Sequence, residues 1–512
     1  MRAGLFLSLC LSFLANATWA KELSVRLQAE PETLDWNRAH TSFEKYVLEN
    51  VMEGLVTFDD KLQVVPALAK SWTRSADGLT YTFQLRADVK WSDGVRLQAQ
   101  DFVTSWKRLL SPITASSYAY LLFDVVGARD FNSGKVKDFS KVGILAPNEQ
   151  TLIVKLEKPL AYWIQLATFW VTFPLRADVI EKNGESWSRP GRMVSLGPYL
   201  LQSYEVDSKI VLKANPNYYG KHGNIDQVNI LIVKDSSVAL NLFQSGKLDV
   251  LIDPSAIDIE RLKGRVELRT FSYLKTVYFG FSVNNLYVNH PKFRRAVAQA
   301  IDRNKLVKVI NSGQQAAGSF VPPHVMGHVA QMGLKFDVDA AKKELKASGY
   351  DTTRGGKLEL LVLNAEKSLM IAQFIQEQLR VNLGVPVEII VQDNRSFRVQ
   401  LDLHSRSSFV GSWSADYPDP DNFLSIFLST GGNNRFDFHD LSIDQKIEKA
   451  KVAMTPEERS KAYGELQTKL IETDAVMVPL FYEPNTVLVK SSVGNFHLSP
   501  LNSLYFKQLQ LQ

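Results

Sequence analysis

Two histidines have a spacing that can bind a metal ion. His324 and His328 are four residues apart, and on a helix this spacing would place both imidazoles on one face. Pro322 and Pro323 precede them, however, and Gly327 lies between them, so the residues favour a loop with solvated histidines over a helix. We therefore predict no metal site and no cofactor.

No motif for covalent or nucleotide chemistry occurs in the sequence. It has no phosphate-binding P-loop, no dinucleotide-binding G-x-G-x-x-G, no H-E-x-x-H and no G-x-S-x-G nucleophile elbow. The single cysteine, Cys10, lies near the N-terminus, so the rest of the chain has no thiol nucleophile, no disulfide and no zinc–thiolate site. Nothing in the sequence positively supports an enzyme, and we expect no catalytic residue.

Three stretches place aromatic and polar residues in apolar contexts. They lie within 69–103, 196–219 and 411–424, and the third reads Gly411-Ser412-Trp413-Ser414-Ala415-Asp416-Tyr417-Pro418-Asp419-Pro420-Asp421-Asn422-Phe423-Leu424. Asp416 directly precedes Tyr417-Pro418, and Asp and Pro both favour turns. The residues alone therefore indicate an ordinary turn aspartate.

The elements around these stretches follow from two periodicities. In 79–90, Tyr81, Phe83 and Leu85 alternate with polar residues, which predicts a half-buried strand, whereas the apolar spacing in 101–110 predicts a helix. Further strands are predicted at 151–156, 209–213, 228–233, 277–283, 358–363 and 385–391, and a helix at 291–301. Another helix starts at Thr455 with Pro456 and a capping box to Glu458, and Ala462, Leu466 and Leu470 form its predicted buried stripe. This mixture predicts an α/β or α+β protein with parallel sheets.

The length of the chain limits the number of domains, and its charge limits the classes of partner. The chain has 512 residues, whereas single cores stop growing at about 250–300 residues, so two or three domains are expected. The formal charge is +5, from 59 Lys and Arg against 54 Asp and Glu, which is too weak a bias to indicate nucleic acid or an anionic membrane. No linker is rich in Pro, Gly or Ser, which favours domains joined by strands that pass between them.

The N-terminus has the pattern of a secretory signal peptide. A basic start at Met1-Arg2 is followed by an apolar run over 5–14 and by small residues up to Ala20. The run is shorter than the about 20 residues of a spanning helix, which disfavours an uncleaved anchor. Leu9 is too bulky for a lipidation site at Cys10. We expect cleavage after Ala20, with Ala17 as the alternative.

With its three stretches, the chain resembles the periplasmic oligopeptide-binding proteins of ABC importers, the extracytoplasmic solute-binding protein family 5. Further matches are Ser245-Gly246-Lys247-Leu248-Asp249-Val250 and Phe293-Arg294-Arg295-Ala296-Val297 leading into Ile301-Asp302-Arg303. The resemblance implies a monomeric periplasmic receptor that captures a peptide or peptide-like solute and delivers it to ABC transporter permease subunits. The alternatives are a receptor for a metal chelate, haem, sugar or opine on the same fold, and a chaperone-like peptide binder.

The fold that the resemblance implies is a bilobal periplasmic-binding-protein clam-shell of type II with an extra inserted domain. Residues 1–20 would be the signal peptide. Lobe I would combine 21–53, 171–270 and 480–512, the inserted domain would be 54–170, and lobe II would be 271–479. Ligand binding would close the lobes about a hinge.

The resemblance also assigns ligand-binding residues. An extended peptide would pair as an added strand with His40, Thr41 and Ser42 on one side and with Ser412, Trp413 and Ser414 on the other. Asp416 falls on the aspartate that receives the peptide α-ammonium, which reverses the turn interpretation. The matches to pocket-lining aromatics are Tyr118 and Tyr278, and each of them fits a core position equally well.

The chain departs from the family where the far end of the ligand would bind. Lys275 and Ser414 occupy the positions of a family disulfide, and Asn394 occupies that of a pocket tryptophan. The positions of the basic residues that receive the peptide carboxylate are Asn311, Leu369, Leu401 and Val410. The cations nearby in sequence are Lys308, Lys367, Arg395, Arg398 and Arg406. Either the carboxylate is met differently, or the far end of the ligand is not a free carboxylate.

Overall fold

The computed structural model describes residues 20–286, 288–351, 356–452 and 455–512. The predicted signal peptide lies outside the described residues except for Ala20. Within the described part of the chain, no helix has the length and apolar character needed to cross a membrane.

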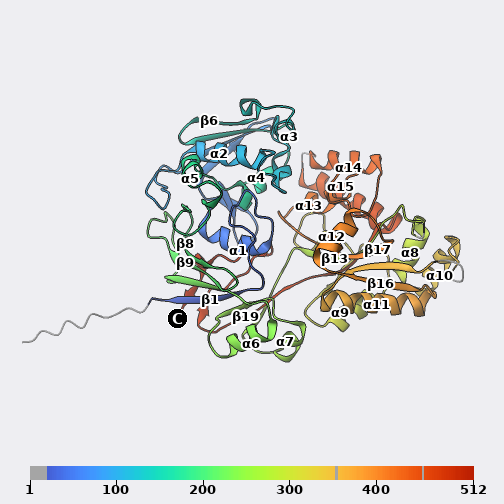
Figure 1. The fold of residues 1–512 in the computed structure, drawn as a ribbon. Coiled ribbons are helices and arrows are strands. Elements are labelled where there is room, and N and C mark those ends of the chain that lie inside the picture. Colours follow the sequence, from blue (N-terminus) through green and yellow to red (C-terminus); the bar gives the residue numbers. More distant parts are fainter. Residues whose placement is uncertain (1–19, 287, 352–355, 453–454) are drawn as a thin grey trace, which may run out of the picture.

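The first of two large sheets has seven strands in the order β12-β19-β11-β1-β10-β9-β8. Its strands are β1 (Glu22–Leu27), β8 (Tyr199–Glu205), β9 (Lys209–Ala214), β10 (Gln227–Ile232), β11 (Val250–Ile252), β12 (Leu268–Phe271) and β19 (Asn485–Val489). The helices packed with this sheet are α1 (Ser42–Val51), α6 (Ser236–Gln244) and α7 (Ala256–Arg261), whereas α5 (Ala177–Asn183) lies beside the third body described below. We call the body built on this sheet lobe I (Figure 1).

The second large sheet, the centre of lobe II, has six strands in the order β14-β18-β13-β17-β15-β16. They are β13 (Lys275–Phe281), β14 (Gln315–Ala316), β15 (Leu358–Leu363), β16 (Val387–Gln392), β17 (Ser408–Ser414) and β18 (Met477–Tyr482). The helices of lobe II are α8 (Pro291–Ala300), α9 (Arg303–Ile310), α10 (Val338–Ala347), α11 (Glu366–Leu383), α12 (Asn394–Asp402), α13 (Pro420–Leu424), α14 (Leu441–Lys451) and α15 (Pro456–Gln467).

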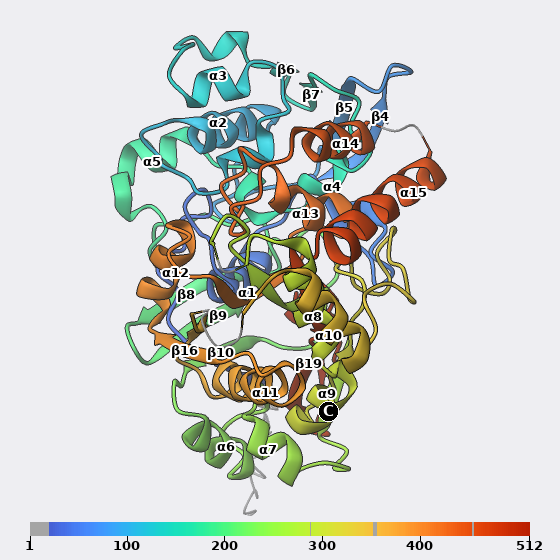
Figure 2. The same ribbon diagram turned by 90° about the vertical axis from the view of Figure 1, so that its right-hand side faces the viewer.

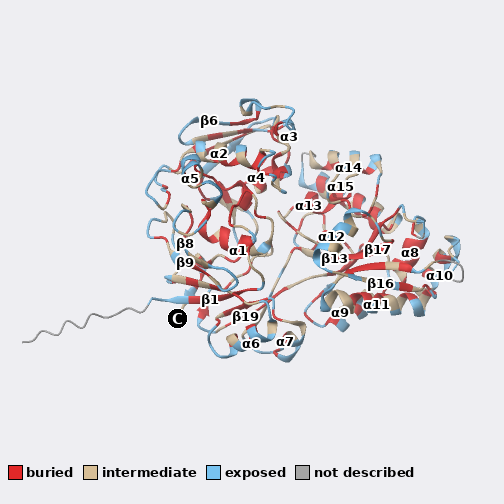
Figure 3. Ribbon diagram, viewed as in Figure 1, coloured by how far each residue is buried: buried red, intermediate tan, exposed pale blue. Residues whose placement is uncertain are grey.

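A third body is inserted above lobe I in Figure 1 and contains a four-stranded sheet in the order β4-β5-β7-β6. Its elements are β2 (Val56–Phe58), β3 (Val64–Pro66), β4 (Ala69–Arg74), β5 (Thr80–Leu85), β6 (Ile144–Asn148), β7 (Thr151–Lys155), α2 (Ala99–Leu110), α3 (Ala128–Asn132) and α4 (Trp163–Leu166). Its buried aromatics, among them Trp106 and Trp163, belong to one continuous hydrophobic core with lobe I, whereas lobe II has a core of its own. Figure 3 shows buried residues in the helices and strands of all three bodies.

Two short connections join the large sheets. The chain leaves lobe I after β12 and enters β13 through residues 272–274, and it returns from β18 to β19 through residues 483–484. In each lobe the two strands pair antiparallel, β12 with β19 and β13 with β18. Two short connections that lie side by side permit rotation of one lobe against the other, because few backbone torsions connect the two bodies.

Most predicted elements are confirmed, and two predictions need correction. Both large sheets are mixed rather than parallel, because β1 and β15 pair parallel with their neighbours while hairpins such as β8–β9 add antiparallel strands. The capping box of Thr455 and Glu458 is present, but the buried face of α15 includes Arg459 and Tyr463, and Ala462 is only partly buried. The predicted stripe missed Arg459 because its charge is neutralised by Asp419, at 2.7 and 2.8 Å.

Candidate functional site

Asp416 lies just past the end of β17, where three bodies of the molecule meet. The amide of Ala415 donates to the carbonyl of Leu274 at 2.8 Å, which ends the pairing with β13. Asn422 on α13 then accepts hydrogen bonds from the Asp416 amide at 3.1 Å and from Trp413 Nε1 at 3.0 Å. Asn422 is buried, and these two bonds hold the bend that follows β17.

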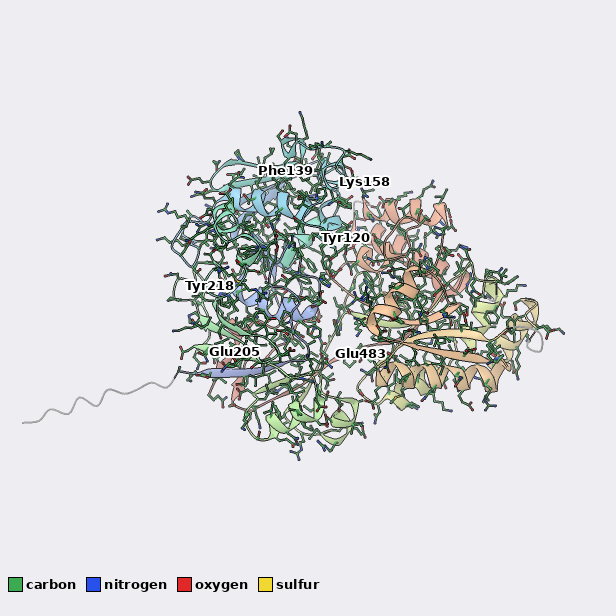
Figure 4. The ribbon with its side chains drawn as sticks, viewed as in Figure 1. Tyr120, Phe139, Lys158, Glu205, Tyr218 and Glu483 are labelled. Carbon is green, nitrogen blue, oxygen red and sulfur yellow. The ribbon has the colours of Figure 1, made fainter. Side chains whose placement is uncertain are left out.

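The Asp416 carboxylate faces the inserted domain and lobe I. Tyr118 and Tyr120 in the inserted domain and the charge of Lys45 on α1 in lobe I all favour its ionised form. Burial raises the pKa of Asp416 to about 6, against the lowering effect of Asn422, Lys45 and the tyrosines. Figure 4 shows Tyr120 on the side of the inserted domain that faces lobe II.

Lys45 does not neutralise Asp416 by direct contact. Its ammonium donates to the Leu501 carbonyl at 2.6 Å, lies 3.7 Å from Glu49 and stands 5.7 Å from the centre of the Trp170 ring. Among the described residues, no cation lies within ion-pair distance of Asp416. The carboxylate is thus partly desolvated and lacks a directly bound positive charge, although the residue keeps some solvent-exposed surface. A cationic group of a ligand would supply the positive charge that the Asp416 carboxylate lacks.

β17 presents an uncovered edge next to Asp416. It pairs with β13 over its whole length, but its parallel pairing with β15 includes only Ser408 and Phe409. Because Ala415 directs its amide to β13 and backbone groups alternate along a strand, Ser412 and Ser414 direct theirs to the opposite edge. No strand of the described chain covers that edge beyond Phe409. An extended ligand backbone could pair there.

His40, Thr41 and Ser42 lie at the N-terminus of α1 rather than in a strand. Thr41 is the N-cap residue, and its amide donates to Glu44 Oε2 at 2.7 Å in a capping box. Trp170 connects this segment to the site, because its indole donates to the Ala39 carbonyl at 3.3 Å and its ring packs edge-on against Tyr118. The segment therefore lies near Tyr118, with the Thr41 amide already engaged.

The two predicted pocket aromatics occupy different environments. Tyr118 is partly buried, packs on Phe169 with ring centres 5.0 Å apart and faces Asp416. Tyr278 is 4% exposed and belongs to the aromatic core of lobe II with Phe320 and Phe409. Tyr278 thus has the surroundings of a core residue, while Tyr118 has those of a site residue.

Of the five cations that lie near the expected carboxylate positions in the sequence, two already have acidic partners. Arg406 binds Glu359 at 2.8 Å, and Lys367 binds Glu483 at 2.7 Å beside the second lobe crossing (Figure 4). The family disulfide positions form a cross-strand pair here, Lys275 opposite Ser414, and the Ser414 hydroxyl accepts from Tyr273 at 3.0 Å. The remaining cations, Lys308, Arg395 and Arg398, are exposed on α9 and α12.

His324 lies in a turn and has a left-handed backbone with φ 70°, and His328 lies in an irregular segment. His328 contacts the Val321 carbonyl at 2.8 Å. Within the described residues, no group of three or more potential metal ligands clusters.

Sequence reasoning missed Tyr120, Asn422, Lys45 and Trp170. Asn422 lies in the third aromatic stretch, and Tyr120 lies two residues beyond Tyr118, so both had a local signal. Lys45 and Trp170 had none, because only the fold brings α1 and the segment after α4 to Asp416.

Two mixed sheets joined by two strand crossings, with a carboxylate and an uncovered strand edge between them, are the architecture of the bilobal periplasmic binding proteins. The profile of the bacterial extracellular solute-binding proteins, family 5 (middle region), matches residues 63–435. The chain belongs to this family.

Individual relatives resemble nearly the whole chain. The periplasmic oligopeptide-binding protein OppA of Salmonella typhimurium is 30% identical over 500 residues, covering 94% of this chain and 91% of its own. The probable deoxycholate-binding periplasmic protein YgiS of Escherichia coli is 29% identical over 501 residues, covering 94% and 92%. The structure of the Escherichia coli murein tripeptide binding protein MppA superposes with a TM-score of 0.84 at 27% identity, covering 96% of this chain and 99% of its own.

Proposed function

We propose that this protein is a periplasmic receptor that binds peptides, or peptide-like solutes with a free amine, between its lobes and passes them to the permease subunits of an ABC importer. It acts as a monomer and leaves the solute chemically unchanged. The environment of Asp416 is the observation that carries the proposal. An α-ammonium would supply the missing charge and three donors, and the ligand backbone would pair with the edge of Ser412 and Ser414.

The names of the relatives support a peptide and a periplasmic location. One is named a periplasmic oligopeptide-binding protein and another a murein tripeptide binding protein. The signal pattern in residues 1–20 agrees with export. In the proposed site, Asp416 anchors the amine, and Tyr118 and Tyr120 hold the carboxylate in place. Trp413 fixes the bend through Asn422, and the segment His40 to Ser42 borders the ligand from lobe I.

A bile-acid anion is the second candidate, because one relative is named a probable deoxycholate-binding protein. Such a ligand has a carboxylate and no amine, so the uncompensated charge of Asp416 would repel it. Deoxycholate that displaced trialanine at equal concentration would favour this candidate.

The amine anchor is tested by a cycle that crosses Asp416→Asn with N-acetylation of trialanine. Removing one partner of a buried charge pair costs about 3–5 kcal/mol, or roughly 10²–10³·⁵-fold in affinity. We expect native protein to lose at least hundredfold on N-acetylation, and Asp416→Asn to lose similarly for the free amine. The acetylated peptide should bind both proteins equally weakly. Isothermal titration calorimetry measures all four affinities.

A coupling energy near zero would contradict the role of Asp416 and favour a turn aspartate. In that case Asp416→Asn would change the melting temperature and affect both ligands alike. Asp393→Asn is a matched control, because Asp393 is an exposed N-cap carboxylate of lobe II.

A further inference from the structure

The direction of a bound peptide follows from the position of Asp416 on β17. A peptide whose ammonium lies at Asp416 can cover the uncovered edge only by running antiparallel to β17, past Ser414 and Ser412 toward Val410. Each extended residue advances about 3.4 Å. The first residue would then lie opposite Ser414 and the third opposite Ser412, so that the carboxylate of a tripeptide would lie near Gly411.

Arg435 and α12 border this far end. Gly411 lies opposite Tyr278 in the strand register, and the charge of Arg435 acts on the Tyr278 hydroxyl. The Arg435 guanidinium forms an ion pair with Asp402, the last residue of α12. The charge of Arg435 is therefore already matched, and the pair places the C-terminal turn of α12 beside the end of the proposed peptide path.

Arg398 lies one turn before Asp402 on the same face of α12. α12 connects β16 to β17 along the chain and packs against β15 and β16, the strands beside the uncovered edge. The charge of Arg398 also acts on Arg435 in lobe II and on Tyr118 in the inserted domain. Figures 1 and 2 show α12 at the level of α1, on the side of lobe II that faces lobe I. Arg398 is exposed, and no ion pair or hydrogen bond joins its guanidinium to the described residues.

The other nearby cations fit this role less well. Arg406 and Lys367 are bound to Glu359 and Glu483. Lys308 lies on α9, which Figures 1 and 2 show near the lower end of lobe II, away from α12. Arg395 lies on α12, but three residues before Arg398 and one turn farther from the Asp402–Arg435 pair.

We propose that Arg398 receives the C-terminal carboxylate of a di- or tripeptide whose ammonium is bound at Asp416, so that this receptor selects short peptides with both termini free. The inference rests on the proposed function and deepens it. Asp416 and Arg398 act as two charges at a fixed separation, and a ligand that neutralises both must match that separation. The positions that the resemblance assigns to carboxylate partners, Asn311, Leu369, Leu401 and Val410, are uncharged.

The test compares trialanine with its C-terminal amide on three proteins: native, Arg398→Gln and Arg395→Gln. In native protein and Arg395→Gln, we expect amidation to weaken binding by about tenfold or more, since hydrogen bonds to charged groups contribute about 1.5–3 kcal/mol and tenfold is about 1.4 kcal/mol. Arg398→Gln should bind the free acid and the amide with the same affinity. All three proteins should share one melting temperature, because both arginines are exposed.

A peptide-length series gives an independent readout. With di- to hexa-alanine, native affinity should be highest at two or three residues and fall beyond, whereas Arg398→Gln should show a flatter dependence. Equal native affinity for trialanine and hexa-alanine, or an amidation loss that persists in Arg398→Gln, would overturn the inference.

The two levels of the proposal fail differently. If Arg398→Gln leaves the amidation effect unchanged while the Asp416 cycle still shows coupling, the role of Arg398 is wrong and the peptide receptor stands. If native protein binds none of these peptides, both proposals are wrong.

Discussion

At the residue scale, Asp416 is a partly buried carboxylate without a directly bound cation among the described residues. It keeps some exposed surface, yet burial raises its pKa to about 6. A carboxyl group with this pKa is ionised at neutral pH, but at a cost that a ligand cation removes. Tyr118 and Tyr120 favour the anion without neutralising it, so the attraction for an ammonium remains.

The affinity for free-amine peptides should therefore depend on pH below about 6. Below this pH the empty site holds a proton that an incoming ammonium must displace, so affinity should fall by about tenfold per pH unit. Above pH 8 it should fall again, because a peptide α-amine has a pKa of about 7.7–8.0. Calorimetry of trialanine between pH 4.5 and 9 measures both limbs.

Asp416→Asn is the control for the acidic limb. The variant should bind weakly with no change between pH 5 and 7, whereas the limb above pH 8 should persist, since it belongs to the peptide. An acidic limb that remained in Asp416→Asn would assign the titration to another group.

At the element scale, the helix caps show which roles the local sequence specifies. The capping box of Thr455 and Glu458 was readable because its residues are three apart in the chain. The capping box of Thr41 and Glu44 at α1 has the same form, yet Thr41 was predicted only as a ligand-pairing residue. In the structure its amide is engaged by Glu44, whose other oxygen accepts from the Glu32 amide at 2.9 Å.

Replacing Thr41 should therefore affect stability more than binding. Loss of an N-cap costs about 1 kcal/mol, so Thr41→Ala should shift the urea unfolding midpoint of lobe I downward while Thr41→Ser, which keeps the cap, should not. The affinity ratio between trialanine and its N-acetyl form should be the same in all three proteins. Unchanged stability with weakened binding would make Thr41 a ligand contact instead.

At the scale of the whole molecule, the inserted domain and lobe II are in contact. Lys158 forms an ion pair with Glu448 on α14 at 2.6 Å, and Tyr162 stacks on Tyr417 with ring centres 5.3 Å apart. Figure 4 shows Lys158 at the side of the inserted domain that faces lobe II. These contacts bridge bodies that the backbone joins only through lobe I, so they stabilise one relative position of the lobes.

Ligand binding should favour the arrangement in which these contacts form. Small-angle scattering should give a smaller radius of gyration with saturating trialanine than without it. Lys158→Gln should enlarge the ligand-free radius and weaken affinity by at most about fivefold, since an exposed ion pair contributes about 0–1 kcal/mol. The matched control is Lys234→Gln, which breaks an exposed pair with Asp207 inside lobe I. An unchanged radius with binding confirmed by calorimetry would contradict closure.

The sequence by itself determined the family, the mixed α/β class and the position of most strands and helices. These properties depend on periodicity, caps and ordered motifs, all of which are local along the chain. The sequence also singled out Asp416, although without the family resemblance the neighbouring residues indicate only a turn. In the structure Asp416 does lie in a bend, directly after β17.

Only the tertiary structure decided what surrounds Asp416 and which cations are free. Tyr120, Lys45 and Asn422 come from three bodies and meet only when the lobes assemble. Arg398 and Arg406 look equivalent in the sequence. In the structure Arg406 is bound to Glu359, whereas Arg398 has no ion-pair partner among the described residues. The physical reason is that desolvation and charge pairing depend on distances in space, which residues far apart in the chain acquire only through the fold.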